Sequence, residues 1–338
     1  MSMLIAARSA LVLETNNLRG GDAAAVRAEA SLQRVMRALA AQSVPLDALA
    51  QLIVTHDGLS EAACAALVAI AGRPIGFVRI DAATGYYDAK NAGFAATDPH
   101  RCDYVVFADA DCLPDREWLA ALLQPFAQQP APAAVAGRTS YRADVLGSAL
   151  TTLDFMYFPS PLQAQATRNF YANNVAFRRA VFAQHGYQPL DGVYRAHCQV
   201  LGLRLQAAGV AVHYAAQAHT VHRLPDTRRE ALQLRWWRGQ DTLGLTPHLV
   251  RAYLPDALQW LGRSGPLGPL CVLASRLWFS ARALNRQDLP PLRGLRWCAA
   301  LLLIVGFSAV DMAGALARGL GWRRGGKADA QALSYHRA

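Results

Sequence analysis

The chain has 338 residues and a formal net charge of +10, with 53% hydrophobic and only 17% charged residues. This composition excludes an intrinsically disordered chain, and the length excludes a small disulfide-stabilised scaffold. The mean hydropathy of +0.11 is high for a soluble enzyme, so we expect part of the chain to contact a membrane.

The cysteines and basic residues exclude further kinds of protein and of partner. The six cysteines form no C-x-x-C pair, which argues against a zinc knuckle or a disulfide framework and favours a reducing compartment. No basic segment precedes an apolar stretch at the N-terminus, so we expect no signal peptide. Nearly all basic residues are arginines, and no basic run interleaved with aromatics is present. We therefore expect no nucleic-acid partner.

The first third of the chain predicts alternating strands and helices. Strands are expected at 9–14, 49–55, 75–80 and 104–108, and helices at 23–41, 61–71 and 87–97. Ser60 can cap the second helix. The alternation predicts an α/β fold with a parallel sheet, in which ligands bind beyond the carboxyl ends of the strands. The polar residues at those ends are Asn16, Asn17, Asp57, Asp109 and Asp111.

The middle of the chain is less regular. An apolar segment at 119–126 ends at a proline break, and a strand at 133–137 follows it. The remaining expected elements are a turn with a short helix at 173–182, a helix at 193–208, a strand at 210–215 and a basic helix at 226–239.

The C-terminal part has a different character. Residues 297–316 contain Asp311 as their only charge and are long enough to span a bilayer. Arginines flank this segment on both sides, so two arrangements stay open, a spanning helix and a helix in the membrane plane. The alternative is a buried C-terminal helix, which small residues such as Ala299 and Gly306 permit.

The strongest motif is Asp109-Ala110-Asp111, which follows the apolar strand at 104–108. Two carboxylates this close repel each other unless a cation joins them. Mg²⁺ and Mn²⁺ take oxygen ligands and bridge to phosphates, so the pair predicts a metal–diphosphate site. The alternative is a polar strand end that caps the next helix.

Three further segments complete a recognisable pattern. They are Lys90-Asn91-Ala92-Gly93, residues 173–179 and residues 233–239. With the D-x-D motif, they make roughly residues 8–245 resemble the family 2 glycosyltransferases, which have the GT-A nucleotide-sugar-binding fold. The resemblance implies a mixed, mostly parallel sheet flanked by helices. It also implies transfer of a sugar from a nucleotide-diphosphate sugar with the help of Mn²⁺ or Mg²⁺.

The resemblance also implies roles for individual residues. The metal would be held by Asp109 and Asp111, with His222 as a third ligand and His219 as the second choice. The donor side would comprise Thr15, Asn17, Asp57, Lys90 and Asn91, and the acceptor side would comprise Asn174 and Trp236. Arg235, on the basic helix, could stabilise the negative charge of the leaving diphosphate, and the alternative is a solvated basic face.

One departure from the family concerns the catalytic base. Family members commonly carry Glu-Asp ahead of the helix at 201–209, whereas this chain has His197-Cys198. An inverting transfer needs a base that removes the proton of the acceptor hydroxyl. His197 is the first candidate, because imidazole titrates near neutral pH, and Asp191 is the reserve. The alternative is that His197 and Cys198 pack at a half-buried helix start.

Together these features predict a GT-A-like domain at 1–245, amphipathic or linker helices at 246–296, a membrane helix at 297–316 and a basic tail at 317–338. The expected partners are a nucleotide-sugar donor, a glycan or lipid acceptor and a membrane surface, at the cytoplasmic face of the inner membrane. Two alternatives stay open. A non-catalytic nucleotide-sugar-binding scaffold fits the missing Glu-Asp, and a nucleotidyltransferase would need a phosphate loop, for which Arg19-Gly20-Gly21-Asp22 is a faint candidate.

Overall fold

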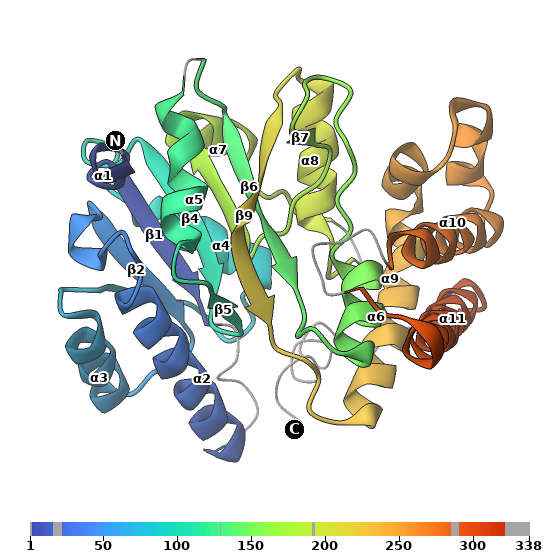
Figure 1. Cartoon of the computed structure of the whole chain (residues 1–338), viewed down its shortest axis with the longest axis horizontal. Coiled ribbons are helices and arrows are strands. Elements are labelled where there is room, and N and C mark those ends of the chain that lie inside the picture. The colour runs from blue at the N-terminus through green and yellow to red at the C-terminus, as the bar shows by residue number, and fades with distance from the viewer. Residues whose placement is uncertain (1, 16–21, 129, 191–192, 285–290, 322–338) are drawn as a thin grey trace.

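A mixed β-sheet lies at the centre of the chain (Figure 1). The computed structural model describes residues 2–15, 22–128, 130–190, 193–284 and 291–321. Within these residues the strand order is β3-β2-β1-β4-β8-β6-β9-β5, and β7 pairs with β9. The strands are β1 (Ser9–Glu14), β2 (Gln51–His56), β3 (Gly76–Arg79), β4 (Tyr104–Asp109), β5 (Cys112–Pro114), β6 (Ala134–Ser140), β7 (Ala166–Thr167), β8 (Asn174–Arg178) and β9 (Val212–His222).

Helices cover both faces of this sheet (Figure 1). Alternate residues of β1 face opposite sides, so Leu11 and Leu13 pack with α2, α3 and α5, whereas Val12 packs with α4, α7 and α8. The helices are α1 (Ser2–Ala6), α2 (Asp22–Ala40), α3 (Glu61–Ala71), α4 (Tyr86–Ala95), α5 (Trp118–Leu123), α6 (Val145–Asp154), α7 (Arg179–His185), α8 (His197–Ala207), α9 (Arg228–Tyr253), α10 (Leu267–Ala283) and α11 (Gly294–Gly319), with the short 3₁₀ helices η1 (Leu46–Ala48), η2 (Gln124–Ala127) and η3 (Asp256–Arg263).

The first third of the chain confirms the predicted alternation. Strands β3-β2-β1-β4 are all parallel, so the carboxyl ends of β1, β2 and β4 meet at one edge of the sheet. The Ser60 hydroxyl accepts a hydrogen bond from the Ala63 amide at 3.1 Å and caps α3 as expected. This edge carries the predicted metal site.

Three elements differ from the sequence-based expectation. The segment at 173–182 contains strand β8, which is antiparallel to β4 in the middle of the sheet, where the expectation was a turn and a short helix. Strand β9 continues to His222 because its second half pairs with β5 and β6. Helix α9 continues to Tyr253 and passes through the predicted boundary at residue 245.

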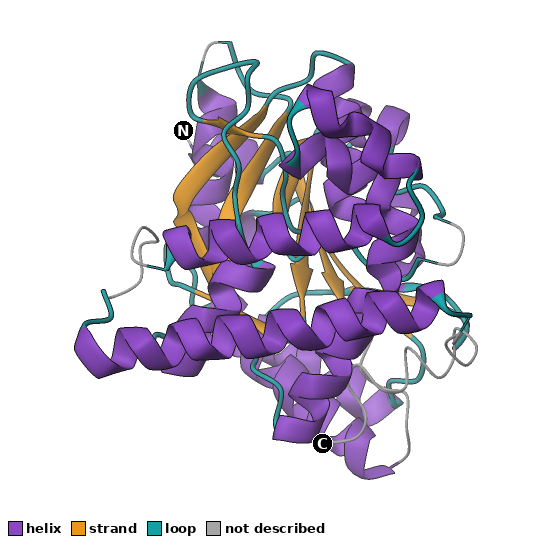
Figure 2. Ribbon diagram, turned by 90° about the vertical axis from the view of Figure 1, so that its right-hand side faces the viewer, coloured by secondary structure: helices purple, strands orange, loops and turns teal. Residues whose placement is uncertain are grey.

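The C-terminal helices form a second layer beside the sheet. Figure 1 places α9, α10 and α11 at one side of the molecule, and Figure 2 looks at that side, where helices lie across the face. Helices α9 and α11 touch closely, because a Cβ atom added at Gly239 would overlap the Asp311 carbonyl oxygen and one added at Gly314 would overlap that of Trp236. The C-terminal helix α11 therefore packs directly against α9.

Candidate metal and nucleotide-sugar site

Asp109 lies at the carboxyl end of β4 and is held by two neighbours from α4. The Tyr86 hydroxyl donates to Asp109 Oδ2 at 2.5 Å, and Lys90 Nζ pairs with Oδ1. Burial raises the pKa of the Asp109 carboxyl above its ordinary value, although the Lys90 ammonium opposes this effect. The predicted Lys90 is 0% exposed, so in this structure it orients Asp109 and does not reach a nucleotide directly.

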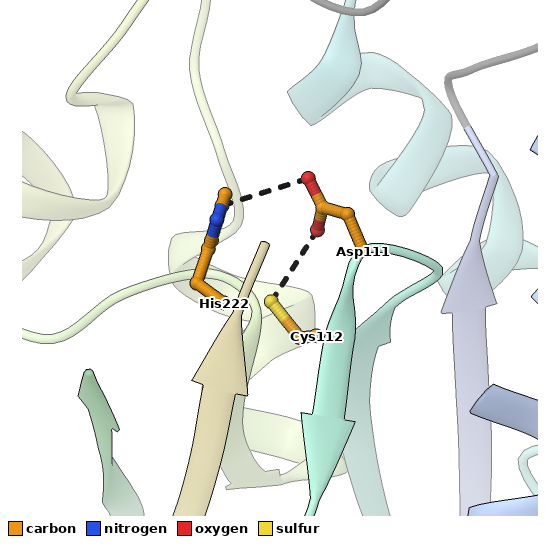
Figure 3. A group of neighbouring side chains, drawn as sticks. All are labelled: Asp111, Cys112 and His222. Atoms are coloured by element: carbon orange, nitrogen blue, oxygen red, sulfur yellow. Dashed lines mark hydrogen bonds and ion pairs between the residues drawn. The ribbon is translucent and has the colours of Figure 1, made fainter. Parts of the chain in front are cut away.

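Asp111 lies two residues further on, directly opposite the end of β9. The antiparallel pairing of β5 and β9 places Cys112 in register with His222, so these side chains and Asp111 converge (Figure 3). The His222 Nε2 atom lies 3.5 Å from Asp111 Oδ2. The Cys112 thiol donates to Asp111 Oδ1 at 3.3 Å. One ligand atom from each of the three lies within 4.8 Å of the others.

The histidine is oriented as a metal ligand. Its Nδ1–H donates to the Arg223 carbonyl oxygen at 2.7 Å, so Nε2 is the ring nitrogen that faces Asp111. Asp111 Oδ2 is buried and has no hydrogen-bond partner among the described residues. A carboxylate and an imidazole are ordinary ligands for Mn²⁺, so these residues fit a divalent cation. Cys112 was missed by the sequence analysis, because only strand pairing brings it to His222.

The second histidine candidate has a different role. His219 Nε2 lies 2.8 Å from the Ser140 hydroxyl, and its Nδ1 lies 2.8 Å from Asp115 Oδ2. Both ring nitrogens therefore have protein partners away from Asp111. His213 is half-buried on β9, and burial lowers its pKa.

The other predicted donor residues are distributed unevenly. Thr15 is buried, and its hydroxyl donates to the Thr55 carbonyl oxygen at 2.6 Å, which joins the ends of β1 and β2. Asp57 follows β2 at the same edge. The Asn91 side chain donates a hydrogen bond from Nδ2 to the Tyr187 carbonyl oxygen at 2.9 Å and accepts one at Oδ1 from the Tyr187 backbone N–H at 3.3 Å. Asn91 therefore holds the backbone at Tyr187 in place. Asn17 lies outside the described residues.

Burial corrects the roles of two predicted substrate-binding residues. Asn174 is 0% exposed, and its Oδ1 atom accepts a hydrogen bond from Trp118 Nε1 at 2.8 Å. Its Nδ2 atom donates to the Arg138 and Ala218 carbonyl oxygens at 3.0 and 2.9 Å. Its hydrogen-bonding groups therefore serve the sheet interior. Arg235 is 2% exposed and forms ion pairs inside the protein.

Arg235 belongs to a buried cluster of four charges. It pairs with Asp154 at the end of α6 and, at 3.3 Å, with Asp311 of α11, while Arg238 also pairs with Asp154. Burial alone would raise the pKa of Asp154, but the two guanidinium groups hold it well below its ordinary value. Trp236 is half-buried where α9 crosses α11. This part of α9 therefore fixes the C-terminal helix to the domain.

A cavity of about 170 Å³ adjoins the metal residues. It lies between α4, α8 and α9, and its charged lining residues include Asp109, Arg195 and Asp241. Arg195 also lines a small channel with Asp111 and His222, and its Nε atom is buried without a hydrogen-bond partner among the described residues. Asp241 is 2% exposed. Sequence analysis missed Arg195 and Asp241, since neither belongs to a motif.

Of the two predicted bases, the structure describes His197. Cys198, beside His197, lines the cavity, whereas the His197 imidazole packs at a tilt against the Tyr87 ring, with centroids 4.3 Å apart. Asp191 lies outside the described residues. The cavity therefore offers Asp241 as a carboxylate that local sequence did not indicate.

A larger groove of about 1250 Å³ starts at the same metal residues. Asp111 and His222 lie at its polar part, and its basic lining residues include Arg142 and Arg228. Leucine and phenylalanine side chains complete it, and they include Leu303 and Phe307 of α11. The groove thus connects the metal residues with the C-terminal apolar helix.

The comparison with protein families decides the class of the chain. Residues 24–186 match the family model described as "Glycosyl transferase family 2". The chain carries a family 2 glycosyltransferase domain. The sequence-based identification is thereby confirmed, and the protein is a glycosyltransferase. A search of curated protein sequences gives no significant match.

Two solved structures serve for comparison, and one of them supports the fold of this glycosyltransferase. The mannosyltransferase PcManGT from Pyrobaculum calidifontis, in complex with GDP-Man and Mn²⁺, is 17% identical with a TM-score of 0.56, over 92% of this chain and 86% of that chain. S. aureus TarS 1-349 in complex with UDP is 10% identical with a TM-score of 0.46, over 90% of each chain. The likeness to PcManGT confirms the expected GT-A-type α/β fold.

Proposed function

We propose that this glycosyltransferase moves a sugar from a nucleotide-diphosphate sugar to an acceptor hydroxyl, with inversion and with Mn²⁺ or Mg²⁺. The observation that carries the proposal is that Asp111 and His222 Nε2 face each other beside Asp109. Asp109 is the last residue of β4, so these groups lie at the carboxyl edge of the parallel strands. PcManGT, which shares the fold, was solved with GDP-Man and Mn²⁺, and this supports a metal-dependent donor site.

Asp111 and His222 would hold the cation, and Asp109 would place a second carboxylate beside it. A cation held there would supply positive charge beside the diphosphate of the donor. Tyr86 and Lys90 fix the Asp109 carboxylate before any ligand arrives, so little rearrangement is needed. Thr15 and Asp57, at the ends of β1 and β2, stay our proposed nucleotide contacts.

Arg195 would bind a negatively charged part of the donor. Its guanidinium lines both the cavity and the channel that contains Asp111 and His222, and its Nε atom has no described protein partner. A positive group at this place stabilises the negative charge that develops on the diphosphate as the sugar leaves.

The base would be Asp241 or His197. Asp241 is proposed because it lines the cavity beside Asp109, whereas the arginines beside Asp154, which also lines the cavity, hold the pKa of that carboxyl too low for efficient proton removal. Asp241→Asn should lower kcat about 10²–10⁴-fold with nearly unchanged donor affinity if Asp241 is the base. The same loss in His197→Ala, with a mild Asp241→Asn, would assign the base to the imidazole.

The acceptor would be a lipid or a lipid-linked glycan at the cytoplasmic face of the inner membrane. The groove that begins at Asp111 and His222 supports this, because Leu303 and Phe307 provide an apolar lining and Arg142 a positive one. An amphiphile with an anionic head matches both parts of the groove.

A donor screen by thermal shift, with Mn²⁺ present, tests the proposal. A ligand that binds only the folded state raises its stability, so the true donor should raise the melting temperature above all other nucleotide sugars. Incubation of that donor with a membrane lipid extract should then release a nucleoside diphosphate and a glycosylated lipid. Binding without release would indicate a non-catalytic nucleotide-sugar-binding protein, and release of pyrophosphate would indicate a nucleotidyltransferase.

A further inference from the structure

Helix α11 turns polar side chains toward the protein and apolar ones outward, which is the reverse of an ordinary surface helix. Its one acidic residue, Asp311, is 1% exposed and faces the protein, and Ser308 is also buried. Between residues 297 and 317, the exposed positions are all apolar or glycine. They are Cys298, Ala299, Leu302, Val305, Gly306, Ala309, Ala313 and Leu316.

These positions form one continuous stripe. They follow one another at steps of three or four residues, which is the spacing of a single helix face. Leu295 and Leu320, which are 88% and 79% exposed, extend the stripe at its two ends. The helix has 26 residues and is therefore about 39 Å long. We call this set, from Leu295 to Leu320, the apolar stripe.

The opposite face of α11 is fixed to the domain. Gly239 and Gly314 bring α9 and α11 into backbone contact, and Asp311 pairs with Arg235. Lipid cannot surround α11 unless this buried ion pair breaks or α9, with its arginines, enters the bilayer core. By length and composition α11 is the one described helix able to cross a membrane, but its packing leaves only the stripe for lipid.

The basic residues at the two ends of α11 indicate the kind of surface that would cover the stripe. Arg293 and Arg296 are exposed at the first end of α11, and Arg318 is half-exposed at the other end. Asp311 is the only acidic residue of the helix, and it is buried. An apolar strip with basic ends fits the interface of an anionic bilayer, where arginines meet lipid phosphates and leucines enter the acyl boundary.

We propose that the apolar stripe binds the surface of an anionic membrane, with α11 lying in the membrane plane and not across it. Leu303 and Phe307 of the same helix line the groove that leads to Asp111, so that groove would open beside the bilayer. The inference deepens the membrane location in the proposed function, but it does not depend on sugar transfer.

Vesicle sedimentation of the full chain tests the surface. We expect binding to vesicles of phosphatidylcholine and phosphatidylglycerol, and about tenfold or more weaker binding to phosphatidylcholine alone. Leu302→Glu should lower the affinity for the mixed vesicles about tenfold or more, because it places a charge in the stripe. Val26→Glu is the matched control, since Val26 is 66% exposed on α2, and it should bind like the wild type.

Depth measurements separate the two orientations. A fluorescent label on Leu302→Cys or Leu316→Cys, in a Cys298→Ser background, should be quenched equally by lipids carrying a shallow quencher. Deep quenching that changes along the helix would show that α11 spans the bilayer and would overturn the proposal. Unchanged vesicle binding of Leu302→Glu would also overturn it. If that variant instead converts a dimer to a monomer, a second copy of the chain covers the stripe. Each readout is independent of sugar transfer.

Discussion

The protein contains two buried charge clusters that differ in balance. At the sheet edge, Asp109 and Asp111 face one ammonium group, that of Lys90, and a histidine whose Nδ1–H is already bonded to a carbonyl. Between α6, α9 and α11, two carboxylates pair with two guanidinium groups. The first cluster has two carboxylates and one ammonium group, whereas each carboxylate of the second cluster pairs with a guanidinium group.

This difference assigns different functions to the two clusters. A buried carboxylate without a full counter-charge is costly unless a ligand supplies that charge, so the first cluster is suited to bind a cation. A paired and hydrogen-bonded cluster holds elements in register, and its loss is felt as instability. The sequence analysis assigned Arg235 to the substrate, and the structure assigns it to the second cluster.

The largest expected effect is on stability and comes from Arg235→Met. The substitution removes the guanidinium group that pairs with both Asp154 and Asp311 in the interior, which should lower the free energy of unfolding by roughly 3–5 kcal/mol. Urea unfolding followed by circular dichroism measures this loss. Arg229→Met is the control, since Arg229 is exposed on the same helix, and it should unfold like the wild type. Equal unfolding of the two variants would contradict the structural role of the second cluster.

The next effect is on activity and comes from Asp111→Asn. A neutral amide cannot replace the carboxylate beside His222, so kcat/KM should fall by roughly 10²–10³-fold or more. The melting temperature should not fall, because the change removes one of two neighbouring negative charges. Asp256→Asn, at an exposed position of η3, is the control for activity. A folded Asp111→Asn variant with full, metal-independent activity would exclude the metal site.

His222→Ala and His219→Ala divide the histidines by role. Loss of His222 should raise the Mn²⁺ concentration for half-maximal activity roughly 10–100-fold, because one ligand disappears. Loss of His219 should leave that concentration nearly unchanged, since its ring bonds Ser140 and Asp115. Activity measured over a series of Mn²⁺ concentrations tests the pair, and the reverse pattern would exchange their roles.

The smallest effect is the pH dependence of the second cluster. The pKa of Asp154 is held below its unfolded value of about 3.9, so its stabilising contribution is present above that pH and is lost as the pH falls through the folded value. The part of the difference in unfolding free energy between wild type and Arg235→Met that comes from Asp154 should therefore shrink as the pH falls below about 4. A difference that grows in acid would contradict this assignment.

Local patterns predicted much of the fold and the first cluster. Hydrophobic runs and turn residues determine the parallel strands β1, β2 and β4, and the D-x-D motif lies at their shared edge. The second cluster was not predictable, because Arg235 and Asp311 are 76 residues apart and meet only when α11 packs on α9. Cys112 and Asp241 were missed for the same reason, since strand pairing and helix packing bring them to the site.

Direct metal binding tests the central claim, that the unbalanced cluster at Asp111 and His222 is a cation–diphosphate site. Mn²⁺ can be titrated into wild type and Asp111→Asn in the presence of a nucleoside diphosphate and followed by electron paramagnetic resonance. We predict one bound Mn²⁺ per wild-type chain and none in Asp111→Asn at the same concentrations, with Arg235→Met, where folded, binding like the wild type. Equal Mn²⁺ binding by wild type and Asp111→Asn would contradict the account.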